Sequence, residues 1–374
     1  MSGLDSLRGF LALYVLLGHA RWLLWAGHRE WVGLVSAPLE LVLGYSSALL
    51  RFGNEAVMVF FALSGFFIHM RAAQKLGSGQ VPTLEPGEFY RRRLHRLLPP
   101  YLLALLVTLF FDALGRGFFP LLYQANSGDA LLDQTFAYKG YSWGSVLPAL
   151  VMLPSSTGMD FGSNGPLWSI AYEVMYYALY PAWLLLRLQS AWASYGGVVV
   201  ACLLLPLLPW SAFPLSVAAL YPVWLAGAAL AELFCRSDRI TLTRGCVATV
   251  AGAALFFAPG LEAMRVIAAL LYGAGMVAVF ARLPGGVTHS PVGRAAEYLG
   301  VRSYTIYVVH FPVLVLLSAV AIQTTGGRPL HDWLALAGAL IAIGIGFLCF
   351  VVGEKRFLHR PVRSSGSVTA GVRE

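Results

Sequence analysis

The chain has 374 residues, of which 58% are hydrophobic and only 12% charged. A water-soluble fold of this size cannot bury so much apolar surface, so the composition excludes an ordinary soluble enzyme and predicts a bilayer as the solvent. The net charge is +8, and the basic residues cluster in short loops between apolar runs. This pattern is typical of membrane topology, with anionic lipid headgroups as partners, and does not indicate nucleic-acid binding.

Apolar stretches that approach the roughly 20 residues of a membrane span follow one another along the chain. They lie near residues 9–27, 54–71, 98–114, 167–187, 194–210, 212–233, 243–259, 263–281, 300–321 and 331–352. The apolar segments 34–50 and 145–153 are too short or too interrupted to span, and we expect interfacial or re-entrant pieces there. The sequence therefore predicts an all-α polytopic integral membrane protein of about ten transmembrane helices.

The distribution of lysine and arginine predicts the orientation, because cytoplasmic loops carry an excess of them. With both termini in the cytoplasm, the basic residues left outside are Arg21, Arg29, Arg51, Arg116, Lys139, Arg265 and Arg328. We therefore expect cytoplasmic N- and C-termini and a location in the cell inner (plasma) membrane. Residues 358–374 are polar and predict a short, disordered cytoplasmic tail.

Arg8 and His19 are the first ionisable residues that the bilayer would make costly, and such residues are functional candidates. They are eleven positions apart, which places them roughly 20° apart around a helix and about 16 Å apart along it. This shared face suits a ligand whose anionic end meets Arg8 and whose reacting end meets a proton-accepting imidazole. The alternative is an arginine that reaches the lipid headgroups and a histidine that only joins helices.

Glu173 and His310 lie inside the fourth and ninth expected spans. An unpaired carboxylate in a bilayer is strongly destabilising, so we expect Glu173 to meet a histidine or arginine of another helix. It would then orient an imidazole, as in other acyl transfers, or only tie helices together. Tyr307 lies one turn before His310 on the same face, and Pro312 loosens the helix beyond it, which leaves catalytic and structural roles for His310 equally open.

Four arginines crowd the stretch Tyr90–Arg96, in the inner loop expected before the third span. Guanidinium groups bind phosphate through two parallel hydrogen bonds, so Arg92, Arg93 and Arg96 form a candidate clamp for a phosphorylated cosubstrate. The alternative is an anchor on anionic lipid.

Several chemistries lack their motifs in this sequence. There is no phosphate-binding glycine loop, dinucleotide fingerprint or His-Glu-x-x-His pattern. The cysteines Cys202, Cys235, Cys246 and Cys349 show no metal-ligand spacing. We therefore expect neither a metal nor a tightly bound cofactor.

Four motifs in fixed order carry a family resemblance. They are Leu4–Gly9 leading to His19, Gly53–Phe67 with Ser64 at its centre, Arg92–Tyr101, and the pair of stretches around Glu173 and His310. In these motifs the chain resembles the acyltransferase-3 family of membrane O-acyltransferases, which modify bacterial surface glycans and some small natural products. The match covers nearly the whole chain and implies a transmembrane acyltransferase-3 domain over residues 1–357.

The resemblance implies a ten-helix core that moves an acyl group, often acetyl, from cytoplasmic acyl-CoA to a hydroxyl of a glycan, a lipid-linked sugar or a small molecule. It implies catalytic roles for Arg8, His19 and Glu173 and cosubstrate binding by the arginines at 8, 92, 93 and 96. Ser64, Tyr307 and His310 are expected to lie near the substrates.

A proton-coupled secondary transporter or glycan exporter is the rival hypothesis, with a proton relay through His19, Glu173 and His310. Recognisable duplicated halves are missing from the sequence, and the arginines exceed what orientation requires, so the enzyme is favoured.

Overall fold

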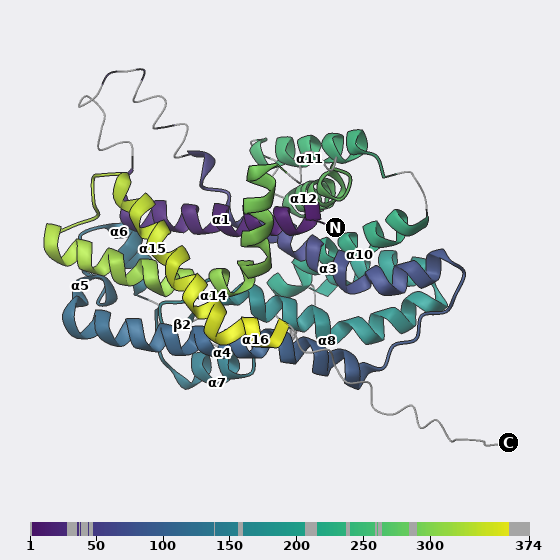
Figure 1. Ribbon diagram of the computed structural model, residues 1–374, viewed down its shortest axis with the longest axis horizontal. Coiled ribbons are helices and arrows are strands. Elements are labelled where there is room, and N and C mark those ends of the chain that lie inside the picture. Colours follow the sequence, from purple (N-terminus) through teal and green to yellow (C-terminus); the bar gives the residue numbers. More distant parts are fainter. Residues whose placement is uncertain are drawn as a thin grey trace.

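The computed structural model (Figure 1) describes residues 2–27, 36, 38, 44, 48–137, 139–155, 160–205, 215–236, 240–258, 260, 264–283 and 290–358. Most of the segment 34–50, for which an interfacial piece was expected, lies outside the described residues. So does the expected tail, apart from its first residue.

The described chain is almost entirely helical. The long helices are α1 (Ser2–Leu24), α3 (Gly53–Gly77), α4 (Pro86–Phe118), α8 (Leu167–Gln189), α10 (Leu215–Arg236), α11 (Leu242–Phe257), α12 (Arg265–Ala281), α14 (Pro291–Thr325) and α15 (Trp333–Cys349). The shorter helices are α5 (Pro120–Tyr123), α6 (Ala130–Phe136), α7 (Trp143–Leu150), η2 (Ala193–Gly197), α9 (Val198–Leu204), η5 (Phe350–Glu354) and α16 (Lys355–Leu358). Two short strands, β1 (Lys139–Gly140) and β2 (Asp160–Phe161), pair in parallel.

The predicted all-α membrane fold is confirmed, and a helix lies at each of the ten predicted spans. Six helices in the described part of the chain, namely α1, α3, α4, α10, α14 and α15 with its continuation, are long and apolar enough to cross a membrane. The helices at 193–204, 242–256 and 265–281 are shorter. The number of spans and the orientation of the termini therefore stay predictions.

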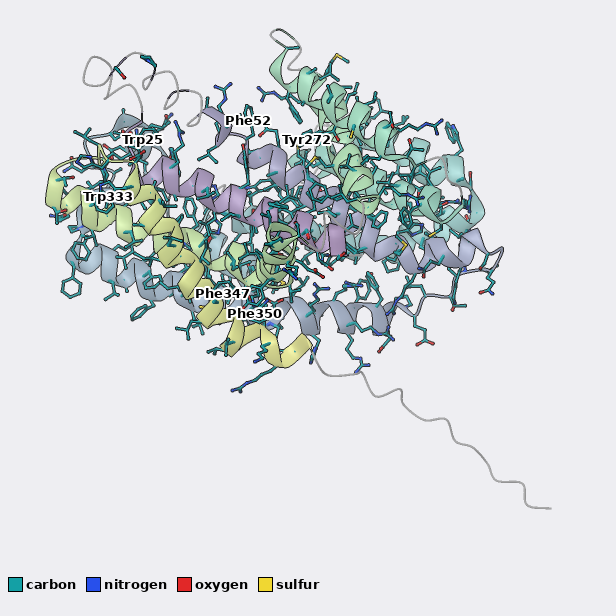
Figure 2. All side chains as sticks on the ribbon, turned by 45° about the horizontal axis from the view of Figure 1, so that its top comes forward. Trp25, Phe52, Tyr272, Trp333, Phe347 and Phe350 are labelled. Carbon is teal, nitrogen blue, oxygen red and sulfur yellow. The ribbon has the colours of Figure 1, made fainter. Side chains whose placement is uncertain are left out.

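The outer faces of the bundle are apolar, as a lipid solvent requires. Leu106 and Phe110 of α4 are more than half exposed, and so are Leu340 and Leu348 of α15. Trp333 at the start of α15, labelled in Figure 2, is also more than half exposed. These faces have no protein partner within the described chain, so we assign them to the hydrocarbon.

Small residues let the central helices approach closely. A Cβ on Gly9 of α1 would lie 1.9 Å from the carbonyl oxygen of Ala296 in α14, and one on Gly300 would meet the α1 backbone at 1.8 Å. Gly65 of α3 and Gly227 of α10 form a second reciprocal contact of the same kind. Because packing and not the hydrophobic effect drives helix association in lipid, these glycines fix where the helices cross.

The expected start of the third helix is wrong. The sequence predicts a loop up to residue 97, but α4 begins at Pro86, so the basic stretch is helical. Proline suits a first helical position, and Glu88 pairs with Arg91 at 2.6 Å and with Arg92 at 2.5 Å, which stabilises the added turns. Pro99 and Pro100 are accommodated inside the helix instead of starting it.

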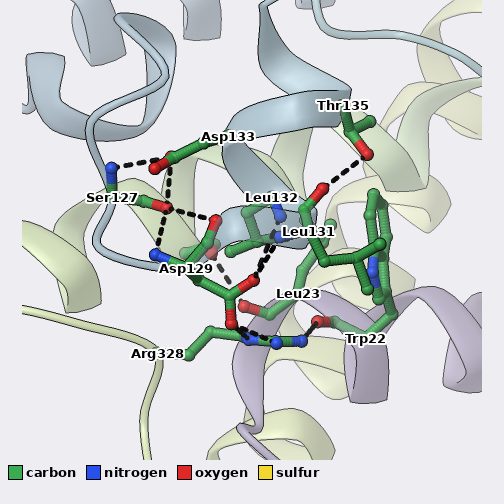
Figure 3. Close-up of polar contacts among 10 residues, drawn as sticks. Trp22, Leu23, Ser127, Asp129, Leu131, Leu132, Asp133, Thr135 and Arg328 are labelled. Atoms are coloured by element: carbon green, nitrogen blue, oxygen red, sulfur yellow. Dashed lines mark hydrogen bonds and ion pairs between the residues drawn. The ribbon is translucent and has the colours of Figure 1, made fainter.

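We call the end of the bundle that holds the first turns of α4 and the last turn of α3 the basic end, and the opposite end the far end. At the far end, Asp129 caps α6 by accepting from the amides of Leu131 and Leu132 and also pairs with Arg328 (Figure 3). The Nη1 of Arg328 donates to the carbonyl oxygen of Trp22 at 3.0 Å. This contact ties the loop after α14 to both α6 and the end of α1.

Candidate active site

A cavity of about 930 Å³ enters the bundle from the basic end. It is lined along α3 from Lys75 to Val57, a distance of roughly 27 Å at 1.5 Å per residue. On α8 it reaches from Leu184 to Ser169, and on α14 from Gly300 to Tyr307. The lining residues of all three helices therefore place the cavity along the bundle axis. Charged residues lie at its basic end, and aromatic and hydroxyl groups lie at its deep end.

The arginines of α4 differ in whether they line the cavity. Arg93 and Arg96 are one turn apart and line the wall, whereas Arg91 is outside the lining and pairs with Glu88. Arg92 lines the wall too, but Glu88 partly neutralises its charge. The Nε of Arg93 is buried and has no hydrogen-bond partner among the described residues. Such an unsatisfied donor beside a cavity fits an anionic ligand.

Arg8 adds a further guanidinium to the wall. It lies 4.2 Å from the centre of the Phe67 ring and 3.4 Å from the carboxylate of Asp5 in the preceding turn. Arg71 and Lys75 also line the cavity. The sequence analysis missed both as site residues because it ended the second span at 71, whereas α3 continues to Gly77.

Glu173 lies midway along the cavity wall. Its carboxylate accepts a hydrogen bond from the hydroxyl of Tyr177, one turn later on α8. The Tyr177 oxygen accepts in turn from Ser64 at 3.1 Å, and Ser64 accepts from the indole of Trp224 at 3.3 Å. A histidine or arginine of another helix was expected to meet Glu173, and Arg8 of α1 and Arg93 of α4 do interact with its charge. Its hydrogen-bond partner in the described chain is Tyr177 of its own helix, which is linked to α3 and α10 through Ser64 and Trp224.

His19 and His310 form a pair beyond the deepest lining residues of the cavity. Nδ1 of His19 lies 2.8 Å from Nε2 of His310. The two rings are parallel within 12°, and their centroids are 5.1 Å apart. That separation is the hydrogen bond plus the two ring radii, so the rings meet edge to edge in one plane. His310 is 1% exposed.

The hydrogen bonds fix the tautomers of this pair. Nδ1 of His310 lies 2.6 Å from the carbonyl oxygen of Tyr307, and a carbonyl only accepts, so that nitrogen carries the hydrogen. Nε2 of the neutral His310 ring must then accept from Nδ1 of His19. His19 is left with its lone pair on Nε2, which is the nitrogen that can take up a proton.

The break that Pro312 makes in α14 is closed from another segment. A proline removes the hydrogen bond to the carbonyl four residues earlier, which here belongs to Val308. The side-chain amide of Asn164 donates to that carbonyl at 2.9 Å and to Thr108 of α4 at 3.0 Å. Asn164 is fully buried, so it joins the start of α8 to the part of α14 that carries His310.

A second buried polar network lies near the basic end, and the sequence analysis did not find it. The carboxylate of Glu232 accepts from Arg187 at 2.7 and 2.5 Å and from Tyr195 at 2.9 Å, and it lies 3.1 Å from His69. These residues come from α3, α8, η2 and α10. Every side chain has a partner, which is typical of a structural tie.

The structure therefore divides the predicted site residues into two groups. Those in the cavity wall are Arg8, Ser64, Arg92, Arg93, Arg96, Glu173 and Tyr307. The histidines at 19 and 310 are hydrogen-bonded to each other and are not in that wall. No group of three or more His, Cys, Asp or Glu side chains is placed to hold a metal ion in the part of the chain that is described.

The comparisons with known proteins agree with this architecture. A family model described as an acyltransferase domain matches residues 1–353. The chain therefore belongs to this acyltransferase family, and together with its apolar helices this makes it a multi-pass membrane acyltransferase. No solved structure gives a significant match.

Three curated relatives are similar over part of their length. Peptidoglycan O-acetyltransferase OatA of Listeria monocytogenes is 25% identical over 84% of this chain and 52% of its own length. Acyltransferase MdmB of Streptomyces mycarofaciens is 29% identical over 44% of this chain and 38% of its own. Protein 2 in picA locus of Rhizobium radiobacter is 29% identical over 48% of this chain and 80% of its own. The chain thus spans about half the length of the first relative and less of the second.

Proposed function

We propose that this protein is an O-acyltransferase of the cell inner membrane that takes an acyl group, acetyl in the first place, from cytoplasmic acyl-CoA and transfers it to a hydroxyl of a carbohydrate or related acceptor. One observation carries the proposal. A single cavity leads from a ring of guanidinium groups at the basic end to Tyr307, and the buried histidine pair begins one helical turn beyond it. The basic end would face the cytoplasm, in keeping with the distribution of lysine and arginine.

The donor would bind with its phosphates among the arginines of the wall. Arg93 and Arg96 offer a repeated fork on one face of α4, and Arg8 faces the same cavity from α1. The thioester would point toward Ser169 and Tyr307 at the deep end of the cavity. Acyl-CoA is a substrate in this scheme, and no tightly bound cofactor is proposed.

His19 would act as the general base. Its Nε2 would take the proton of the acceptor hydroxyl while the hydroxyl oxygen attacks the thioester carbon. The new bond is the ester C–O bond, the bond that breaks is the C–S bond, and the sulfur leaves as the thiolate of CoA, which receives a proton back. His310 would be a positioning residue, because its hydrogen bond selects the His19 tautomer with an accepting Nε2.

Glu173 would act within the wall instead of on His19. Its carboxylate holds the Tyr177 hydroxyl, and through it Ser64, in one arrangement. We propose that this row of hydroxyls positions the acyl arm along α8. A direct orienting contact from Glu173 to His19, which the sequence analysis expected as one possibility, is not needed in this mechanism.

Two observations support the proposed acceptor: the name of a relative and the position of His19 along α1. The Listeria relative is named for peptidoglycan as its acceptor, which supports a carbohydrate for this chain. His19 lies near the last turns of α1, at the far end. The acceptor hydroxyl would therefore approach from the far side, opposite to the donor.

The test is acetyl-CoA binding by the detergent-purified protein, followed by release of CoA thiol when cell-envelope glycan is added. We expect saturable binding, and acceptor-dependent thiol release that stops in His19→Ala. If the protein binds neither acetyl-CoA nor free CoA, the proposed donor site is contradicted. Proton-coupled transport would then be the function to assay.

A further inference from the structure

Two aromatic rings line the deep part of the cavity, one turn short of Val57, its deepest lining residue on α3. Its deepest residue on α14 is Tyr307, and Phe60 lies near its deepest point on α3. The centroids of these two rings are 6.0 Å apart and their planes are inclined by 63°, an edge-to-face contact. We call this contact between Phe60 and Tyr307 the aromatic floor.

The Tyr307 side of the aromatic floor is held rigidly. The Tyr307 hydroxyl lies 2.8 Å from Oγ of Ser169, and Ser169 donates to the carbonyl oxygen of Pro166 at 3.0 Å. Tyr307 must therefore donate to Ser169. The ring is 8% exposed, so it is fixed both by packing and by a hydrogen bond to α8.

The histidine pair lies directly behind the aromatic floor. The ring centroid of His310 is 5.7 Å from that of Tyr307. A rise of three residues along α14 is about 4.5 Å. The His19–His310 pair thus begins one helical turn beyond the deepest cavity residue of α14.

From this arrangement we propose that Phe60 and Tyr307 select the acyl donor by length, admitting acetyl and excluding butyryl and longer chains. The inference rests on the proposed function. Each added methylene has to fit between the thioester carbon and the two rings, so a longer chain holds that carbon back from the histidines. Close-packed aromatic residues do not yield at low cost, because overpacking is destabilising.

The test measures affinities of the detergent-purified protein for CoA, acetyl-CoA, butyryl-CoA and hexanoyl-CoA. In the wild type we expect acetyl-CoA to bind at least as well as CoA, and butyryl-CoA more weakly. Phe60→Ala removes one ring of the aromatic floor. It is expected to raise the affinity for butyryl-CoA relative to acetyl-CoA by roughly 10-fold or more, because a hydrophobic pocket typically distinguishes ligands that differ by one methylene by about that factor. Phe60→Leu, a milder change, is expected to act in the same direction.

Phe66→Leu is the matched control for Phe60→Leu. Phe66 lies on the same helix and is fully buried, but it does not line the cavity, and its ring packs on Phe234 of α10 with centroids 5.8 Å apart. The ratio of butyryl-CoA to acetyl-CoA affinity should therefore stay at its wild-type value in this variant.

The outcomes separate this inference from the proposed function. If the wild type binds acetyl-CoA but binds hexanoyl-CoA equally well, the length selection is wrong and the donor site stands. An unchanged ratio in both Phe60 variants would overturn it in the same way. A wild type that binds none of the four ligands would overturn the donor site itself.

Discussion

The two halves of the site differ in how their polar groups are satisfied. In the cavity at the basic end, Arg93 has a buried Nε without a partner in the described chain, and Arg96 is exposed. Beyond the aromatic floor, the ring of His310 is 1% exposed and both of its nitrogens are hydrogen-bonded. Unsatisfied cations suit the capture of an anionic ligand, whereas a buried, fully bonded imidazole suits a fixed tautomer. Binding and proton transfer are thus expected to depend on different residues.

The largest expected effect is that of His19→Ala. Loss of the general base should lower turnover by about 10²–10⁴-fold while acetyl-CoA binding is retained, because the arginines that would bind the donor lie in the cavity wall and His19 does not. The measurement is thiol release at saturating donor, together with the dissociation constant. The exposed His95→Ala serves as control. Loss of donor binding in His19→Ala would contradict the separation of the two halves.

His310→Gln should lower turnover less, toward the lower end of the same ~10²–10⁴ range, because it removes the group that selects the tautomer and leaves the base in place. A positioning role also predicts a changed pH profile, since His19 loses its partner ring. Turnover is measured against pH at saturating donor. A His310→Gln enzyme with lower turnover but the wild-type profile would indicate that His310 only fills space.

The double variant Arg93→Ala, Arg96→Ala should act on the other half. Loss of two charge-assisted hydrogen bonds is expected to weaken acetyl-CoA binding by roughly 10- to 100-fold and to change turnover at saturation little. Arg91→Ala is the matched control, because Arg91 lies in the same run and pairs with Glu88 but is not part of the cavity wall. If the double variant and Arg91→Ala weaken acetyl-CoA binding equally, the arginines of this run interact with lipid headgroups instead of the donor.

The smallest effect is expected at the far-end contact of Asp129 with α6 and Arg328. Burial alone would raise the pKa of this carboxyl, but hydrogen bonds from the Leu132 amide and from Arg328 outweigh it and lower the pKa below its ordinary 3.8. The contact therefore stabilises the fold above about pH 4 and is lost as the pH falls through the lowered value.

Asp129→Ala should cost about 1 kcal/mol in the free energy of unfolding at neutral pH, through the lost cap. The difference from wild type should shrink on acidification. Thermal unfolding in detergent at several pH values measures it, and acetyl-CoA binding should not change. A difference that stays constant down to acidic pH would contradict the ionic contribution.

Much of the architecture could be predicted from the sequence. The apolar periodicity placed a helix at each expected span because hydrocarbon leaves the backbone no partner except itself. The family and four arginines of the cavity wall, at positions 8, 92, 93 and 96, were also predictable, since guanidinium groups have few roles in a bilayer protein other than binding anions or marking topology. The start of α4 at Pro86 was not predicted, because Pro99 and Pro100 suggested a later helix start. The ion pairs of Glu88 that stabilise the first turns were not recognised in the sequence.

Only the tertiary structure decided which residues meet. His19 and His310 are 291 positions apart, and their contact depends on where α1 and α14 cross. Gly9 and Gly300 set that crossing because a Cβ on either would collide with the facing backbone. The apolar stretches of the sequence predict how deep in the membrane each residue lies. Which residue of another helix it contacts at that depth depends on how the helices pack, and no local sequence pattern encodes this.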